Sequence, residues 1–258
     1  MSKSTAFGLL SKDNSRPLHY RFLKRQRHRV NRWIAASSKI SNAPVLDAEL
    51  FDWTGKLERN WQTIRDEAQA IYQHLDSIPP LREISPDHRG IVSDNSWRSF
   101  FLIGYGNRVE ANIARAPRTA NLVSEIPGLN SAFFSILAPG SVITPHRGVS
   151  KGFVTAHLGL QIPRDNEACW MRVDDRRAHW RPGKWLIFDD TYEHEVRNDS
   201  DEWRIILLCQ VERPLRAPGS WMAAAMMAYI RRSKFVQEAK DNLADWETTF
   251  AKAERGEI

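Results

Sequence analysis

Short apolar runs, separated by glycine, proline, aspartate and asparagine, fill the chain between residues 131 and 212. They are rich in Val, Ile, Phe and Trp, which favour β-strands. Many short strands at this spacing are typical of a sandwich or barrel of the jelly-roll kind. We therefore predict strands at 132–138, 141–144, 153–162, 168–173, 184–188, 194–198 and 203–212.

Helical patterns lie on both sides of this predicted β core. Apolar residues recur at spacings of three and four from Leu57 to Leu75, which predicts a helix that ends before a pair of prolines. A second helical pattern runs over roughly 221–247. We expect one mainly β domain with flanking helices, in three parts: a basic N-terminal segment with a helical extension (1–90), the β core (91–215) and a C-terminal helix (216–258).

One predicted strand, FVTAHLGLQI at 153–162, has two different faces, because successive strand residues point to opposite sides. One face is polar and small in its middle, with Thr155, His157 and Gly159, which suits a strand that lines a cavity. The other face is apolar and suits packing; it carries Val154, Ala156, Leu158, Leu160 and Ile162.

Arg204 lies near the start of another apolar strand, WRIILLCQVE. It shares a face with Ile206 and Leu208, and the burial of an unpaired charge is very costly. Two interpretations are open. Either a bound anion neutralises the guanidinium inside the protein, or Arg204 lies at the exposed end of the strand and pairs with a nearby acid.

The net charge of +6 is unevenly distributed. Eight Lys or Arg and no acid lie between Arg16 and Lys39. This basic segment, 16–39, is either a solvated surface or a contact site for anionic lipid or another polyanion. No nucleic-acid recognition motif accompanies it, so we expect no nucleic-acid partner.

Cysteine positions and hydropathy indicate the cellular compartment in which the protein works. Cys169 and Cys209 both lie in apolar runs, which argues against a disulfide framework and fits a reducing compartment. The longest apolar run, Trp221–Ile230, is too short to span a bilayer, and the N-terminus has no apolar stretch of signal length. We expect a cytoplasmic protein, or one peripheral to the inner face of the membrane; the sequence leaves the oligomeric state undetermined.

Two histidines lie in short polar motifs that interrupt the strand pattern. His146 is in TPHRG and His194 is in YEHEV, several predicted strands apart. An H-x-[DE] motif with a distant histidine forms the facial triad of non-haem iron(II) oxygenases. Here Arg147 and Gly148 follow His146, so the carboxylate is absent from its usual place.

The motifs PHRG, AHLGLQIP, W-x-x-GKWLIFDDTYEHEV and R-x-I-x-L occur in this order. In them the chain resembles the aspartyl/asparaginyl β-hydroxylase family, whose bacterial relatives include lipid A and ornithine-lipid hydroxylases. The resemblance runs from about Trp97 to Pro218. It implies a cupin-like double-stranded β-helix that uses Fe(II), with 2-oxoglutarate and O2 as co-substrates.

The resemblance also implies roles for individual residues. This family binds iron with two histidines and no carboxylate, so His146 and His194 match the metal ligands. Arg204 matches the arginine that pairs with the distal carboxylate of 2-oxoglutarate, and Ser135 matches the serine that assists it. His157 matches a histidine that contacts the other end of the co-substrate. No catalytic residue is implied beyond the iron centre.

The sequence departs from the family at one position: Thr155 stands where the family often has an arginine, which leaves the strength of co-substrate binding open. Acids near His194 are candidates for a third ligand. We expect instead that they cap the turn or orient a histidine: Asp189, Asp190, Glu193 and Glu195.

The resemblance does not decide the substrate. The basic segment and the helix 221–230 with its cationic flank favour a lipid, such as ornithine lipid or lipid A, and contact with an anionic membrane surface. One alternative is β-hydroxylation of Asp or Asn in a peptide, or of a free amino acid. A further alternative is a non-catalytic jelly-roll binding protein.

Overall fold

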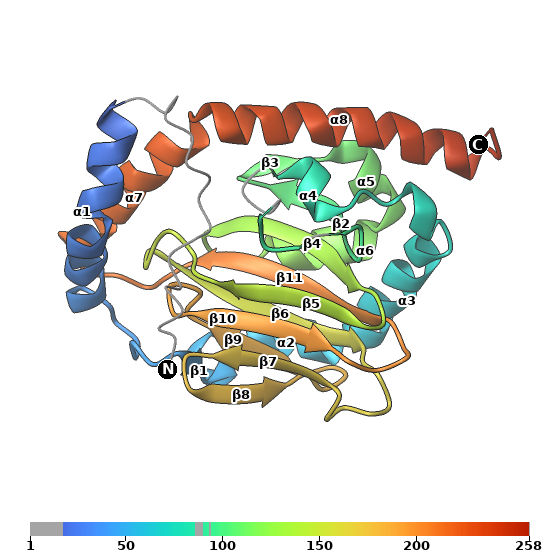
Figure 1. Cartoon of the computed structure of the whole chain (residues 1–258), viewed down its shortest axis with the longest axis horizontal. Helices are drawn as coiled ribbons and strands as arrows, with labels where there is room; N and C mark the ends of the chain where they lie inside the picture. The colour runs from blue at the N-terminus through green and yellow to red at the C-terminus, as the bar shows by residue number, and fades with distance from the viewer. Residues whose placement is uncertain (1–17, 86–89, 93, 258) are drawn as a thin grey trace, which may run out of the picture.

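The computed structural model describes residues 18–85, 90–92 and 94–257 (Figure 1). Its centre is a pair of antiparallel sheets built mainly from strands that follow one another in the chain. These strands are β4 (Leu129–Leu137), β5 (Ser141–His146), β6 (Phe153–Gln161), β7 (Cys169–Val173), β8 (Arg176–His179), β9 (Trp185–Phe188), β10 (His194–Asn198) and β11 (Arg204–Glu212).

From β4 to β11 the chain passes back and forth between the two sheets, with β7 and β8 forming a hairpin within the smaller one. The larger sheet has the order β1-β9-β6-β11-β4-β2-β3 and the smaller one β5-β10-β7-β8. The short strand β1 (Val45–Leu46) extends one edge of the larger sheet, and β2 (Trp97–Gly104) with β3 (Asn107–Arg108) extends the other. This winding of one chain through two facing sheets confirms the predicted double-stranded β-helix of the cupin-like, jelly-roll kind.

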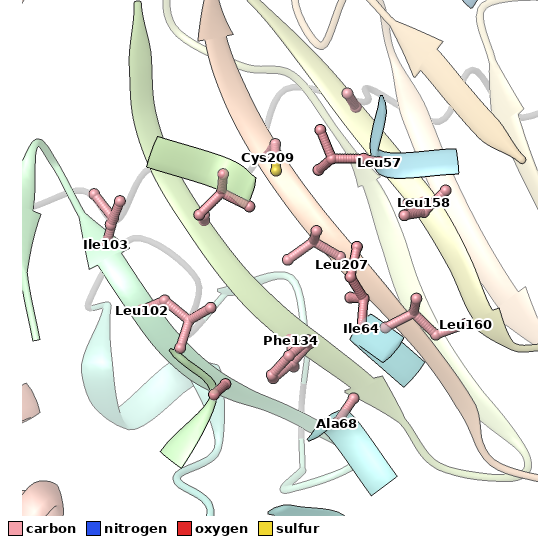
Figure 2. Close-up of a cluster of buried hydrophobic side chains, with 14 of the residues drawn as sticks. Leu57, Ile64, Ala68, Leu102, Ile103, Phe134, Leu158, Leu160, Leu207 and Cys209 are labelled. Atoms are coloured by element: carbon pink, nitrogen blue, oxygen red, sulfur yellow. The ribbon is translucent and has the colours of Figure 1, made fainter. Parts of the chain in front are cut away.

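Helices cover the outer face of the larger sheet, where they bury one hydrophobic core (Figure 2). Ile64 and Ala68 of the helical layer meet Leu158 and Leu160 of β6 and Leu207 of β11. The apolar face predicted for 153–162 is therefore confirmed up to Leu160. Beyond the end of β6 the alternation stops, and Ile162 packs against the other core, between the sheets.

The helices are shorter than the sequence pattern predicted. The expected helix from Leu57 to Leu75 is divided at Asn60, whose φ of −108° is not helical, into α2 and α3. The expected C-terminal helix is also two helices, because Ser233 caps the second one with its side chain. The helices are α1 (Leu18–Ala36), η1 (Ala48–Leu50), α2 (Thr54–Arg59), α3 (Trp61–Tyr72), η2 (Leu75–Ser77), α4 (Leu81–Ile84), α5 (Glu110–Arg115), α6 (Pro117–Ser124), α7 (Gly219–Arg231) and α8 (Lys234–Glu254).

Several elements were missed by the sequence pattern: α1, β8, the two-residue strands β1 and β3, and the short helices α4, α5 and α6. Helix α1 falls in the basic segment, where charge obscures the apolar periodicity, and β8 is the polar edge strand RRAH. Within the ranges that the structure describes, no helix has the length and apolar character needed to cross a membrane. The division of the chain at residues 90 and 215 stays a prediction.

A buried ionic cluster holds together the segments that surround the two histidines. The fully buried Asp189 lies just after β9 and accepts from Arg213 Nη2 at 2.5 Å and from Lys151 Nζ at 2.6 Å. The Oδ1 atom of Asp189 accepts from the backbone and side chain of Thr191. Arg213 also donates to the carbonyl of Ser41, so the cluster joins four separate stretches of chain.

The substitution Arg213→Met should lower the free energy of unfolding by about 3 kcal/mol, because it leaves a buried carboxylate with one cation fewer. Chemical denaturation followed by circular dichroism measures this loss. Arg108→Met is the matched control, since Arg108 pairs with Glu110 at the exposed surface, and it should leave stability unchanged. Equal stability of the two variants would show that the buried cluster does not hold the fold.

Candidate active site

The two histidines of the short polar motifs are direct cross-strand partners. His194 opens β10 and lies opposite His146 at the end of the antiparallel strand β5. Their ring centroids are 4.1 Å apart. The register shifts between His194 and Val196, next to Pro145, which has no N–H to donate to the ladder. This irregularity changes the direction of the strand end and lets both rings meet on one side.

Backbone contacts fix which ring nitrogen of each histidine is free. The Nδ1 atom of His146 lies 2.8 Å from the carbonyl oxygen of Thr144, and that of His194 lies 2.9 Å from the carbonyl oxygen of Tyr192. A carbonyl only accepts, so in each ring Nδ1 carries the proton and Nε2 keeps its lone pair. A metal ligand needs this arrangement.

Both imidazoles are held in the neutral form. Burial lowers the pKa of His146 and lowers the pKa of His194 to about 3. The positive charge that His146 would carry is a second cause for His194. Because neutral imidazole is the form that binds a metal, the pair can act as ligands at neutral pH.

The place of the missing carboxylate is filled by another residue. A Cβ added to Gly148 would lie 2.2 Å from Oδ1 of Asp190, so a side chain at position 148 would require the Asp190 side chain to move. The backbone N–H of Gly148 donates to the Asp190 carbonyl at 2.6 Å. Thr155, at the family's arginine position, directs its hydroxyl toward Asp190 Oδ2 at 3.4 Å. Burial, with the charge of Asp189, raises the pKa of Asp190 to about 7.

The other acids near His194 form ion pairs. The expected capping of the turn is made by Asp189, whose Oδ1 accepts from the backbone N–H of Thr191, whereas Glu193 and Glu195 pair with arginines and not with a histidine. Asp189 belongs to the buried ionic cluster, Glu195 pairs with Arg172, and Glu193 lies within 3.7 Å of Arg147. Across residues 18–85, 90–92 and 94–257, no three His, Cys, Asp or Glu side chains are grouped so as to hold a metal ion. The candidate metal centre therefore consists of two imidazoles.

Arg204 lies inside the protein, so of the two interpretations left open, the exposed end of the strand is ruled out. Its side chain is 1% exposed, and Nη2 donates to the Ser135 hydroxyl at 3.1 Å. Trp97 also donates to that hydroxyl, which holds it in place. In the described part of the chain Arg204 has no carboxylate partner and its Nε has no hydrogen-bond acceptor. Burial lowers the pKa of Arg204 to about 10, so it is still charged at neutral pH.

Trp180 connects Arg204 to His157. The guanidinium lies 4.8 Å from the centroid of the indole ring, and the indole N–H donates to Nδ1 of His157 at 3.2 Å. Because Nδ1 accepts, the neutral His157 ring carries its proton on Nε2, and no described residue accepts from that atom. Sequence reasoning missed Trp180, although it opens the W-x-x-GK motif.

An aromatic chain links these residues to the two histidines. The Phe188 ring lies 5.0 Å from His157 and 5.3 Å from His194, measured between ring centroids. The structure thus joins all five predicted site residues by a series of contacts, which runs from the two histidines through Phe188, His157 and Trp180 to Arg204 and Ser135. Two buried donors without acceptors, one of them a cationic side chain, fit a bound dianion, since burial of unsatisfied donors is otherwise costly.

Comparisons with known proteins identify the family. The family described as aspartyl/asparaginyl β-hydroxylase matches residues 58–214. An ornithine lipid ester-linked acyl 2-hydroxylase from Rhizobium tropici is 38% identical over 213 residues, which cover 83% of this chain and 76% of that protein. Human aspartyl/asparaginyl β-hydroxylase is 35% identical over 63% of this chain, but the match spans only 21% of the human protein.

The solved structures are less similar to this chain than the relatives found by sequence. A cupin 2 conserved barrel domain protein from Salinispora arenicola is 14% identical, with a TM-score of 0.31, over 52% of this chain and 87% of that one. The strand order, and not this overlap, establishes the fold. The matched region covers more than half of the sequence and includes all five site residues. The chain therefore belongs to the aspartyl/asparaginyl β-hydroxylase family, a family of Fe(II)- and 2-oxoglutarate-dependent hydroxylases.

Proposed function

We propose that this hydroxylase binds Fe(II) through His146 and His194 and hydroxylates an unactivated C–H bond in the acyl part of an amino-acid-containing or lipid A-type lipid. The observation that carries the proposal is the facing pair of neutral imidazoles, each with its Nδ1 on a backbone carbonyl. Aromatic contacts connect this pair to the buried guanidinium of Arg204, whose Nε has no acceptor among the described residues. When bound, Fe(II) with 2-oxoglutarate and O2 supplies the oxidising chemistry, and the net products are a hydroxylated substrate, succinate and CO2.

The side chains have separate tasks in this proposal. Arg204, oriented by Ser135, pairs with the distal carboxylate of 2-oxoglutarate, because a guanidinium offers two parallel donors to a carboxylate. His157 donates from Nε2 to the other end of the co-substrate. The buried Trp180 and Phe188 exclude water from the space between these groups.

The extent of the relatives' matches supports a lipid substrate. The Rhizobium tropici acyl hydroxylase matches 83% of this chain, whereas the human enzyme matches 63%. The similarity to the acyl hydroxylase thus covers more of this chain, and substrate selection is expected to differ within a family. Such a lipid resides in a bilayer, so the proposal implies contact between the protein and a membrane surface.

Purified protein should convert an ornithine lipid extract to a product with one added oxygen when Fe(II), ascorbate and 2-oxoglutarate are supplied. Mass spectrometry of the extract measures this product. His194→Ala should abolish it, whereas the control His179→Ala, a partly buried histidine of β8, should keep it. Full turnover by folded His194→Ala protein would reject the proposed ligands, and an added oxygen only on Asp or Asn of peptides would reject the lipid substrate.

Arg204→Met should raise the 2-oxoglutarate concentration needed for half-maximal activity by roughly 100-fold, since the loss of one partner from a buried ion pair costs about 3 kcal/mol. Succinate formation at varied 2-oxoglutarate concentrations measures the change. Arg177→Met, at the exposed edge of the smaller sheet, is the control and should leave the requirement as it is in the unsubstituted protein. An unchanged requirement in Arg204→Met would assign the carboxylate contact to another residue.

Trp180→Phe should allow the neutral His157 ring to carry its proton on either nitrogen, because the substitution removes the indole N–H that donates to Nδ1. Nitrogen-15 chemical shifts of the labelled ring report which nitrogen carries the proton. In the unsubstituted protein we expect the proton on Nε2, and in the variant a mixture of both forms. The control Trp170→Phe, on β7, should give the same spectrum as the unsubstituted protein. The same spectrum from Trp180→Phe would show that Trp180 does not position the His157 ring.

A further inference from the structure

Exposed large apolar side chains are concentrated at one end of the molecule. Among the residues that the structure describes, five such side chains are strongly exposed, and four of them lie on α1, on α7 or on the loop after His146. They are Trp33 (62% exposed), Val149 (49%), Trp221 (72%) and Tyr229 (39%). The fifth, Leu50, lies in η1. Isolated exposed apolar residues need no explanation, but a concentration of them does.

Helix α7 has an apolar face that points outward. Its inward face packs through Gly219, Ala223 and Met227, which are buried. The exposed face carries Trp221, Ala224, Ala225 and Tyr229, at the spacing of one helical stripe. A helix that only packs against a core would have polar residues there, so this face is suited to an apolar environment.

Helix α1 adds positive charge beside that face. Arg29 and Arg32 are exposed and lie on one side of α1, because residues three apart share a helix face. The contact between the helices lies close to both tryptophans, since a Cβ on Gly219 would lie 2.3 Å from the Cβ of Ser37. Figure 1 shows the two helices side by side. No acid occurs in the sequence from 14 to 46 or from 213 to 237, so the cations have no neutralising neighbours within these stretches.

The same helices hold the loop that follows His146. Asn31 of α1 donates to the carbonyl of Val149 at 3.2 Å and accepts from the backbone N–H of Lys151 at 3.0 Å. On the other side, a Cβ on Gly152 would lie 2.9 Å from the Cβ of Ala223 in α7. The exposed apolar residues are therefore continuous with the segment that carries a proposed metal ligand.

We propose that Arg29, Arg32, Trp33, Val149, Trp221 and Tyr229, which we call the α1–α7 surface, dock the enzyme on an anionic lipid bilayer. This inference rests on the proposed lipid substrate and names the surface that reaches it. Tryptophan and tyrosine favour the boundary between head groups and acyl chains, and arginines beside them contact anionic head groups. Docking of this surface brings the His146 loop to the bilayer, where an acyl chain can enter the site.

Flotation with vesicles tests the surface directly. Full-length protein should bind vesicles of phosphatidylglycerol and phosphatidylcholine but not vesicles of phosphatidylcholine alone. The double variant Arg29→Gln/Arg32→Gln should bind about 25-fold more weakly, because each basic residue near an anionic bilayer contributes roughly five-fold. The control Arg118→Gln/Arg176→Gln removes the same charge from α6 and β8 and should bind as the unsubstituted protein does.

The tryptophans are tested by Trp33→Ala/Trp221→Ala. Both side chains are exposed, so the variant should fold, which circular dichroism checks. We expect it to lose the part of vesicle binding that survives at 0.5 M NaCl, where charge attraction is screened. Equal loss of binding in the Arg29/Arg32 variant and the Arg118/Arg176 control would overturn the surface in favour of a general effect of net charge.

Two further outcomes separate this inference from the proposed function. Hydroxylation of detergent-dispersed lipid without any vesicle binding would overturn the α1–α7 surface and leave the lipid substrate intact. Vesicle binding lost in both surface variants would support the surface even if no lipid were hydroxylated. A stable dimer that Trp33→Ala/Trp221→Ala dissociates, with no vesicle binding, would assign the surface to a second copy of the chain.

Discussion

The antiparallel pairing of β5 with β10 is the constraint on which the proposed active site depends. It sets His146 and His194 opposite one another, with each Nδ1 bound to a backbone carbonyl two residues earlier. Side chains alternate along a strand, so a register shift of one residue would turn one ring to the other face. The strand ladder, the irregularity beside Pro145 and the two carbonyls therefore fix both the position and the free nitrogen of each imidazole.

The two adjacent acids after β9, Asp189 and Asp190, have different surroundings. Asp189 turns to Arg213 and Lys151, which neutralise it in the interior and join the stretches of chain that meet there. Asp190 takes the space that a side chain at Gly148 would need. A side chain at 148 would therefore displace the Asp190 carboxyl group, which with Gly148 in place stays buried.

The loop after His146 lies between the proposed metal site and the exposed α1–α7 surface. It runs between α1 and α7, which hold it through the amide of Asn31 and through close contact with Ala223. A displacement of either helix would therefore move the segment that carries one proposed iron ligand. In the proposed function, one loop carries both a residue of the lipid-facing surface, Val149, and a proposed iron ligand, His146. An acyl chain could then reach the site while its head group stays at the bilayer.

The sequence by itself determined the jelly-roll class and most of the strands of the core, and it named the residues of the proposed site, because strand alternation and the ordered motifs are local signals. It left the position of Arg204 open and missed α1, β8 and the role of Trp180. Those features depend on contacts between residues far apart in the chain: the Ser135 hydroxyl, the indole of Trp180 and the packing of α1 on α7. Only the tertiary structure decides them, since a buried charge or an exposed apolar stripe is defined by what packs around it.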